Sequence, residues 1–180
     1  MVCIGETSDG FAVIDRRRIE LFPPGEEWAK QPYHAAESLE PSEAQRIVDR
    51  GISSAREQAV LKIRDEVRRL AMSDIQIARI AVLVPSPMPE WTTREILAVH
   101  FRMHKAEGVL FPDALCRAAK DCGLHLVSVP EKELGRIAEA TFDLTFDSAM
   151  DFVTKLGRQA GPPWGRDQKY AALAAIIAMN

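Results

Sequence analysis

Apolar side chains recur every three or four positions between residues 42 and 70, which is the spacing of one face of an α-helix. The opposite face carries mixed charges, as in the segment KIRDEVRR. Ser42 stands before the pattern as a candidate N-cap residue. The pattern predicts a long amphipathic helix with one face in the core and the other in solvent. Its apolar positions are Ala44, Val48, Ile52, Ala55, Ala59, Ile63, Val67 and Leu70.

Shorter apolar segments on both sides of this helix predict strands. At the N-terminus, CIGET, GFAVID and RIELFPP are separated by turn and charged residues and predict an antiparallel hairpin or meander. The segment IARIAVLVP is almost continuously apolar, as expected for a buried central strand. LHLVSVP predicts a further strand.

The remaining segments predict helices. Thr92 or Thr93 is expected to cap a helix, and a second helical segment follows in which Pro112 should kink or restart the helix. Gly123 is typical of the position just after a helix end. A short helix from about Glu131, an irregular or helical stretch and a final alanine-rich helix complete the chain. This order predicts an α/β fold, a mixed sheet with helices on both faces, in a single domain over residues 1–180.

Composition narrows the function classes. An apolar fraction of 47% and a charged fraction of 27% are typical of a globular protein. The net charge of −3 gives no overall basic field, so nucleic-acid binding would need a local patch. The three cysteines match no common zinc spacing and are expected to be reduced thiols. No segment looks like a membrane span or a signal peptide, so we expect a cytoplasmic protein without membrane contact.

The segment HFRMHKAEG carries a cluster of chemically active residues. His100, His104 and Glu107 are spaced i, i+4, i+7 and share one helix face. Imidazoles and a carboxylate on one face can bind a transition metal, or can pair as a base and its orienting group. The structural alternative is a pair of hydrogen-bonded histidines at a helix edge. Tyr33 and His34, on a long polar connection, are further candidates because loops often carry function.

The segment GPPWGRDQK places a charged cluster at the start of the final helix. Alanines behind Asp167 predict close docking of this helix on the sheet, which would hold the carboxylate near the strand ends. Alternatively, Asp167 only complements the helix N-terminus. Arg166 and Lys169 could position a phosphate or neutralise Asp167.

The order of elements resembles the ribonuclease H-like superfold, and the segment His104–Leu134 resembles the helix–glycine–strand–proline segment of RuvC-type Holliday-junction resolvases. CIGETSDGFAVID is similar to the first hairpin of that superfold, and GRDQKYAALAAIIA to its last helix. The resemblance implies a mixed five-stranded sheet that begins with the antiparallel hairpin or meander.

In the nuclease families of this superfold, acidic residues hold two magnesium ions that drive phosphodiester hydrolysis. The resemblance places Glu6, or else Asp9, at the first acidic position and Asp167 at the last. With Glu107 from the helical cluster, these carboxylates would bind Mg²⁺ or Mn²⁺. His104 and Lys169 join them as candidate catalytic residues. The candidates for substrate binding are Arg166, His100, Tyr33 and His34.

The expected function is that of a metal-dependent nuclease or resolvase-like phosphodiester hydrolase acting on nucleic acid. The alternative is a non-catalytic ribonuclease H-like interaction module that forms a homodimer. Two observations favour the alternative: IARIAVLVPSP supplies no glutamate from the central strand, and the net charge is acidic.

Overall fold

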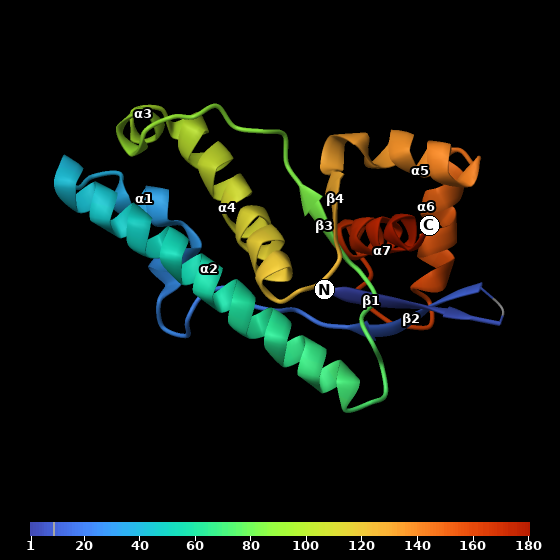
Figure 1. Cartoon of the computed structure of the whole chain (residues 1–180). Helices are drawn as coiled ribbons and strands as arrows, with labels where there is room; N and C mark the ends of the chain where they lie inside the picture. Colours follow the sequence, from blue (N-terminus) through green and yellow to red (C-terminus); the bar gives the residue numbers. More distant parts are fainter. Residues whose placement is uncertain (9) are drawn as a thin grey trace. The chain divides into compact units, whose positions relative to one another are not determined.

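The chain is a helix-rich α/β protein whose strands form two separate pairs in the described residues (Figure 1). The structure is a computed structural model that describes residues 1–8 and 10–180. Helical residues make up 58% of the chain. The strands are β1 (Val2–Thr7), β2 (Gly10–Arg16), β3 (Ile80–Val84) and β4 (Leu126–Pro130). The helices are η1 (Glu27–Lys30), α1 (Pro32–Ala36), α2 (Pro41–Ala71), α3 (Thr93–Leu97), α4 (His100–Asp121), η2 (Glu131–Glu133), α5 (Leu134–Phe142), α6 (Phe146–Leu156) and α7 (Arg166–Met179).

The prediction of a ribonuclease H-like, mixed five-stranded sheet is wrong. β1 pairs antiparallel with β2, and β3 pairs with β4, so the described residues form two two-stranded sheets. The expected third strand, RIELFPP, is irregular. Pro23 and Pro24 lack the backbone N–H group that a strand ladder needs, which disfavours pairing there. The apolar segments therefore predicted the strands β1, β2, β3 and β4. They did not predict which strands pair, because pairing depends on contacts between residues that are distant in the sequence.

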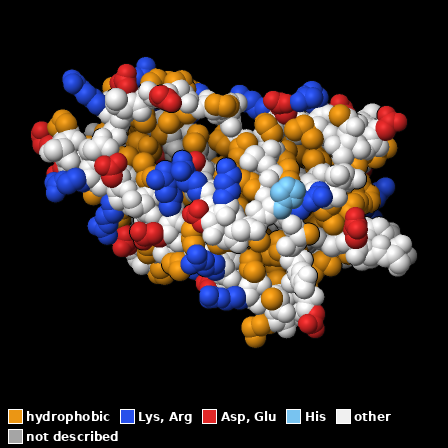
Figure 2. Space-filling view, viewed as in Figure 1, with side chains coloured by type: hydrophobic (Ala, Val, Ile, Leu, Met, Phe, Trp, Pro, Cys, Tyr) orange, Lys and Arg blue, Asp and Glu red, His pale blue; other side chains and the backbone are white. Residues whose placement is uncertain are grey.

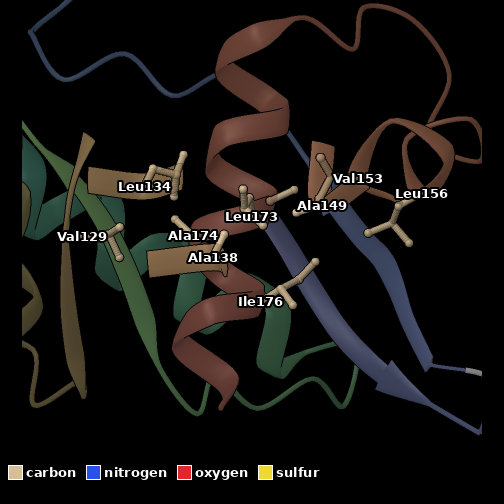
Figure 3. Packing of buried hydrophobic residues seen from close by; sticks show 10 residues of the cluster. Val129, Leu134, Ala138, Ala149, Val153, Leu156, Leu173, Ala174 and Ile176 are labelled. Atoms are coloured by element: carbon tan, nitrogen blue, oxygen red, sulfur yellow. The ribbon is translucent and has the colours of Figure 1, made fainter. Parts of the chain in front are cut away.

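The chain divides into two compact units. The first comprises residues 1–19, 79–83 and 126–180 and contains both strand pairs together with α5, α6 and α7. In its core, α7 lies between side chains of β4 and α5 on one side and of α6 on the other (Figure 3). The buried residues are Val129, Leu134, Ala138, Ala149, Val153, Leu156, Ala172, Leu173, Ala174 and Ile176.

The second unit comprises residues 20–78 and 84–125 and is built from η1, α1, α2, α3 and α4. Its core consists of Tyr33, Ala36, Ala44, Val48, Ile96, Met103 and Ala106. The chain's internal contacts divide into two compact units, and the expectation of one domain over residues 1–180 stays a prediction. No helix in residues 1–8 and 10–180 is both long enough and apolar enough to cross a membrane.

Helix α2 confirms the predicted long helix and explains where α1 lies. Its buried face includes Val48, Ala55 and Ile63, as the periodicity indicated. The predicted N-cap at Ser42 is wrong, because the helix already begins at Pro41. Proline suits this first position, where a backbone N–H would have no helical partner. Gly51 allows a close approach of α1, since a Cβ there would lie 2.4 Å from Cβ of Pro32.

Helices α3 and α4 differ from the prediction at one point. Thr92 caps α3 through a reciprocal capping box with Glu95, which confirms the expected cap. Of the two outcomes expected at Pro112, the restart is wrong, because α4 runs from His100 to Asp121 through this proline, and the kink stays a prediction. A proline inside a helix lacks the N–H group for one backbone hydrogen bond. The buried residues Leu110 and Ala114 pack on either side of Pro112 and offset this loss. Gly123 adopts a positive φ of 69° just after the helix end, as predicted.

Candidate metal centre

Three histidine side chains converge in the second unit. His34 comes from α1, and His100 and His104 come from the first turns of α4. Their ligand atoms all lie within 4.8 Å of one another, and Nε2 of His100 lies 3.0 Å from Nε2 of His104. Among the histidine, cysteine and acidic side chains of residues 1–8 and 10–180, these three histidines form the group that could hold a metal ion.

Glu107 fixes the orientation of His34. Its Oε2 lies 2.7 Å from Nδ1 of the imidazole, and its Oε1 accepts a 3.1 Å hydrogen bond from the His34 backbone N–H. The Glu107 side chain is only 8% exposed. A carboxylate at Nδ1 favours the tautomer that carries its proton there, so Nε2 of His34 is left with a free lone pair. A carboxylate–histidine pair of this kind commonly supports a metal ligand.

The two histidines of α4 lie at the surface. Their i, i+4 spacing places them on one helix face, as the sequence predicted. His100 has a 63% exposed side chain, and its Nδ1 is 3.9 Å from a carboxylate oxygen of Glu37. His104 is also exposed. The cluster therefore has one oriented, partly buried imidazole and two that face solvent, which leaves room for a further ligand.

Tyr33 precedes His34 but belongs to the core. Its side chain packs in the second unit, and burial is the main cause that raises the pKa of its phenol, with Asp49 and Glu107 adding to the effect. The phenol is therefore neutral and anchors α1 next to the histidine cluster. Its assignment to substrate binding stays a prediction.

The donor set bears on the choice of metal. Imidazole nitrogens suit zinc, copper, iron and nickel, whereas Mg²⁺ prefers oxygen ligands. Three imidazoles therefore fit a transition metal. The Mg²⁺ or Mn²⁺ expected from the sequence belongs to the carboxylates Glu6, Glu107 and Asp167 and stays a prediction. The sequence assigned His34 and His100 to substrate binding and His104 to catalysis. It did not predict that all three would meet.

The expected carboxylate set of Glu6, Glu107 and Asp167 is divided between the units. Glu107 lies in the second unit, and the other two lie in the first. Glu6 is an exposed residue of β1 opposite Phe11, and Asp167 is an exposed residue in the first turn of α7. Asp9, the alternative first carboxylate, lies outside the described residues. A metal site with these three carboxylates stays a prediction.

The two basic candidates of α7 have different surroundings. Arg166 lies 3.4 Å from a carboxylate oxygen of Glu131, and its guanidinium stacks 4.8 Å from the centre of the Tyr170 ring. Lys169 lines a shallow hollow next to Trp164. Arg166 therefore already has an acidic and an aromatic neighbour, and the roles of both residues in phosphate binding stay predictions.

Sequence reasoning missed the part of His34 in the cluster. His34 lies far from α4 in the sequence, and the spacing of His100, His104 and Glu107 carries no signal for it. No family model, curated protein or solved structure matches the chain. The candidate site is therefore interpreted from its own geometry.

Proposed function

We propose that the protein is a metal-dependent hydrolase with His34, His100 and His104 as the metal ligands. One observation carries the proposal: three imidazoles converge within 4.8 Å, and a buried carboxylate orients one of them. Three protein ligands with an open position are typical of catalytic zinc sites, whereas structural zinc sites have four protein ligands. The exposure of His100 and His104 supports such an open position.

A bound transition-metal ion supplies Lewis acidity and lowers the pKa of water in contact with it. The residues of the chain have separate tasks. Glu107 would hold the His34 proton at Nδ1 and so leave the lone pair of Nε2 for a metal ion. Glu37, next to His100 and about half exposed, is the carboxylate that can accept a proton at the solvent side.

The substrate class to test first is a phosphodiester, the class expected from the sequence. The assay is hydrolysis of bis(p-nitrophenyl) phosphate by the full chain, with Zn²⁺, Co²⁺, Mn²⁺ or Mg²⁺ added to metal-free protein. We expect activity with a transition metal and its loss in His104→Ala. The matched control is His125→Ala, because His125 is exposed and lies outside the cluster. Equal activity in both variants would exclude the histidine centre from the reaction.

A non-catalytic metal-binding module is the second candidate. The observation that favours it is the exposure of the cluster, since a metal at the surface can accept a ligand from a partner protein. The two candidates differ in this phosphodiester assay: the module binds the metal but does not hydrolyse the phosphodiester. Hydrolysis lost specifically with His104 would contradict the module.

A further inference from the structure

The exposed face of α2 has a self-complementary charge pattern. Residues 56–65 read REQAVLKIRD. The centre of this segment lies between Val60 and Leu61. Glu57 and Arg64 lie at the same distance from this centre along the sequence, on opposite sides. Arg56 corresponds in the same way to Asp65. These two pairs of charges are therefore complementary, whereas Lys62 corresponds to the uncharged Ala59.

These residues lie on the side of α2 that faces away from its core. Arg56, Glu57, Arg64 and Asp65 are exposed, whereas the core face of the same turns is buried. Leu61, at the centre of the pattern, is 51% exposed. In the view of Figure 2, basic and acidic side chains are interspersed over the surface rather than separated by sign. Leu61 therefore offers an exposed apolar contact between complementary charges.

A groove borders this face. It has a volume of about 820 Å³ and is lined by Val60 and Leu61 of α2 and by Cys116 and Lys120 of α4, among others. Side chains of a neighbouring helix can enter such a groove. The groove adds Cys116 and Ala118 of α4 to the apolar contact, and charged side chains line the rest of it.

We propose that the protein forms a homodimer in which α2 packs antiparallel against α2 of a second copy. The two-fold axis passes between Val60 and Leu61. In this register Glu57 faces the partner's Arg64, and Leu61 packs against the partner's Val60. A two-fold axis repeats every contact, so each ion pair occurs twice.

Charge selects the antiparallel arrangement. In a parallel pair of identical helices, each residue faces its own copy, so Glu57 would face glutamate and Arg64 would face arginine. Like charges in direct opposition are unfavourable. Arg56 also has a partner within its own chain, since it lies 3.6 Å from Asp113. The ion pairs among residues 1–8 and 10–180 include neither Glu57 nor Arg64, so these two residues are the pair that fixes the register.

The dimer should be weak and sensitive to salt. Its centre has few apolar residues, which is typical of interfaces at the small end of the size range. Ion pairs between exposed side chains are screened as ionic strength rises. We therefore expect the dimer to be populated at high protein concentration in low salt and to dissociate at about 1 M salt.

Sedimentation velocity of the full chain tests the proposal. Glu57→Arg and Arg64→Glu should each place like charges in opposition, and we expect the dimer dissociation constant to rise about tenfold or more in each variant. An equimolar mixture of the two variants should dimerise again, because opposite charges then meet at both positions. This recovery also shows that both variants are folded.

Three results would overturn the proposal. The first is a wild-type chain that stays monomeric at high concentration in low salt. The second is a dimer that either single variant leaves unchanged. The third is a mixture of the two variants that sediments as monomers.

Discussion

At the scale of single residues, Glu107 connects the core to the candidate site. It is almost fully buried, and its two oxygens contact the ring and the backbone of His34. One carboxylate thus fixes both the position of α1 and the tautomer of its histidine. Because of this double role, a replacement that tests metal binding has to keep the size of the Glu107 side chain, as glutamine does.

Glu107→Gln should weaken metal binding while the chain stays folded. The amide keeps the size of the side chain but cannot hold a proton at His34 Nδ1 as a carboxylate does. We expect a loss of about 10–100-fold in affinity, the usual effect of removing such a supporting group. Isothermal titration with Zn²⁺ measures it, and Glu90→Gln, at an exposed position, is the control. Affinity equal to that of the control would contradict the role of Glu107.

At the scale of elements, the contact between α1 and α2 positions His34. The two helices approach closely at Gly51, where any side chain would collide with Pro32. The collision can be relieved only by a shift of α1, which carries His34 with it. Local packing and the metal centre are therefore coupled.

Gly51→Ala should lower both stability and metal affinity. Overpacking of this kind destabilises proteins by about 1–3 kcal/mol. Gly108→Ala is the matched control, because Gly108 also lies within a helix but has open space where a Cβ would go. At position 108, alanine should raise the free energy of unfolding by up to about 1 kcal/mol relative to glycine. Urea denaturation of both variants measures their free energies of unfolding. Equal changes in the two variants would show that the α1–α2 contact accommodates a Cβ at position 51.

The capping box of α3 predicts a dependence of stability on pH. The hydrogen bonds from the backbone and side chain of Thr92 lower the pKa of Glu95. The unfolded chain therefore binds this proton more readily than the folded chain, so stability rises with pH in the acidic range. The contribution is complete above about pH 5 and is lost as pH falls through the lowered pKa.

Thr92→Ala should reduce this pH-dependent contribution, because alanine loses the side-chain hydrogen bond to Glu95 and keeps the one from the backbone N–H. Loss of an N-cap side chain destabilises a protein by about 1 kcal/mol at neutral pH. The difference in unfolding free energy between wild type and Thr92→Ala should shrink as pH falls from about 6 toward 3, since protonated Glu95 no longer accepts these bonds. Urea denaturation across this range measures it. A difference that is constant with pH would contradict the assignment to Glu95.

At the scale of the whole molecule, prediction from sequence succeeded where the signal was local. The long helix α2, the cap at Thr92 and the end of α4 at Gly123 follow from periodicity and from the conformations that single residues prefer. The sheet could not be predicted in this way, because pairing joins segments that are far apart in sequence. The prediction of a five-stranded sheet assumed that strands recognised one by one along the sequence would also pair in a single sheet.

The candidate site shows the same limit. His100, His104 and Glu107 share a helix face, and their spacing alone predicted that. His34 reaches them because α1 packs tightly on α2 at Gly51, a contact that the local sequence does not encode. The metal set taken from the resemblance, Glu6 with Asp167, stays a prediction because these residues lie in the other compact unit from Glu107.

The most direct test of the account is a titration of metal-free protein with Co²⁺, followed by visible absorption. The account predicts one equivalent bound per chain, with loss of the absorption in His34→Ala, His100→Ala and His104→Ala and its retention in His125→Ala. A chain that binds no Co²⁺, or that binds it equally well without His104, would contradict the histidine centre.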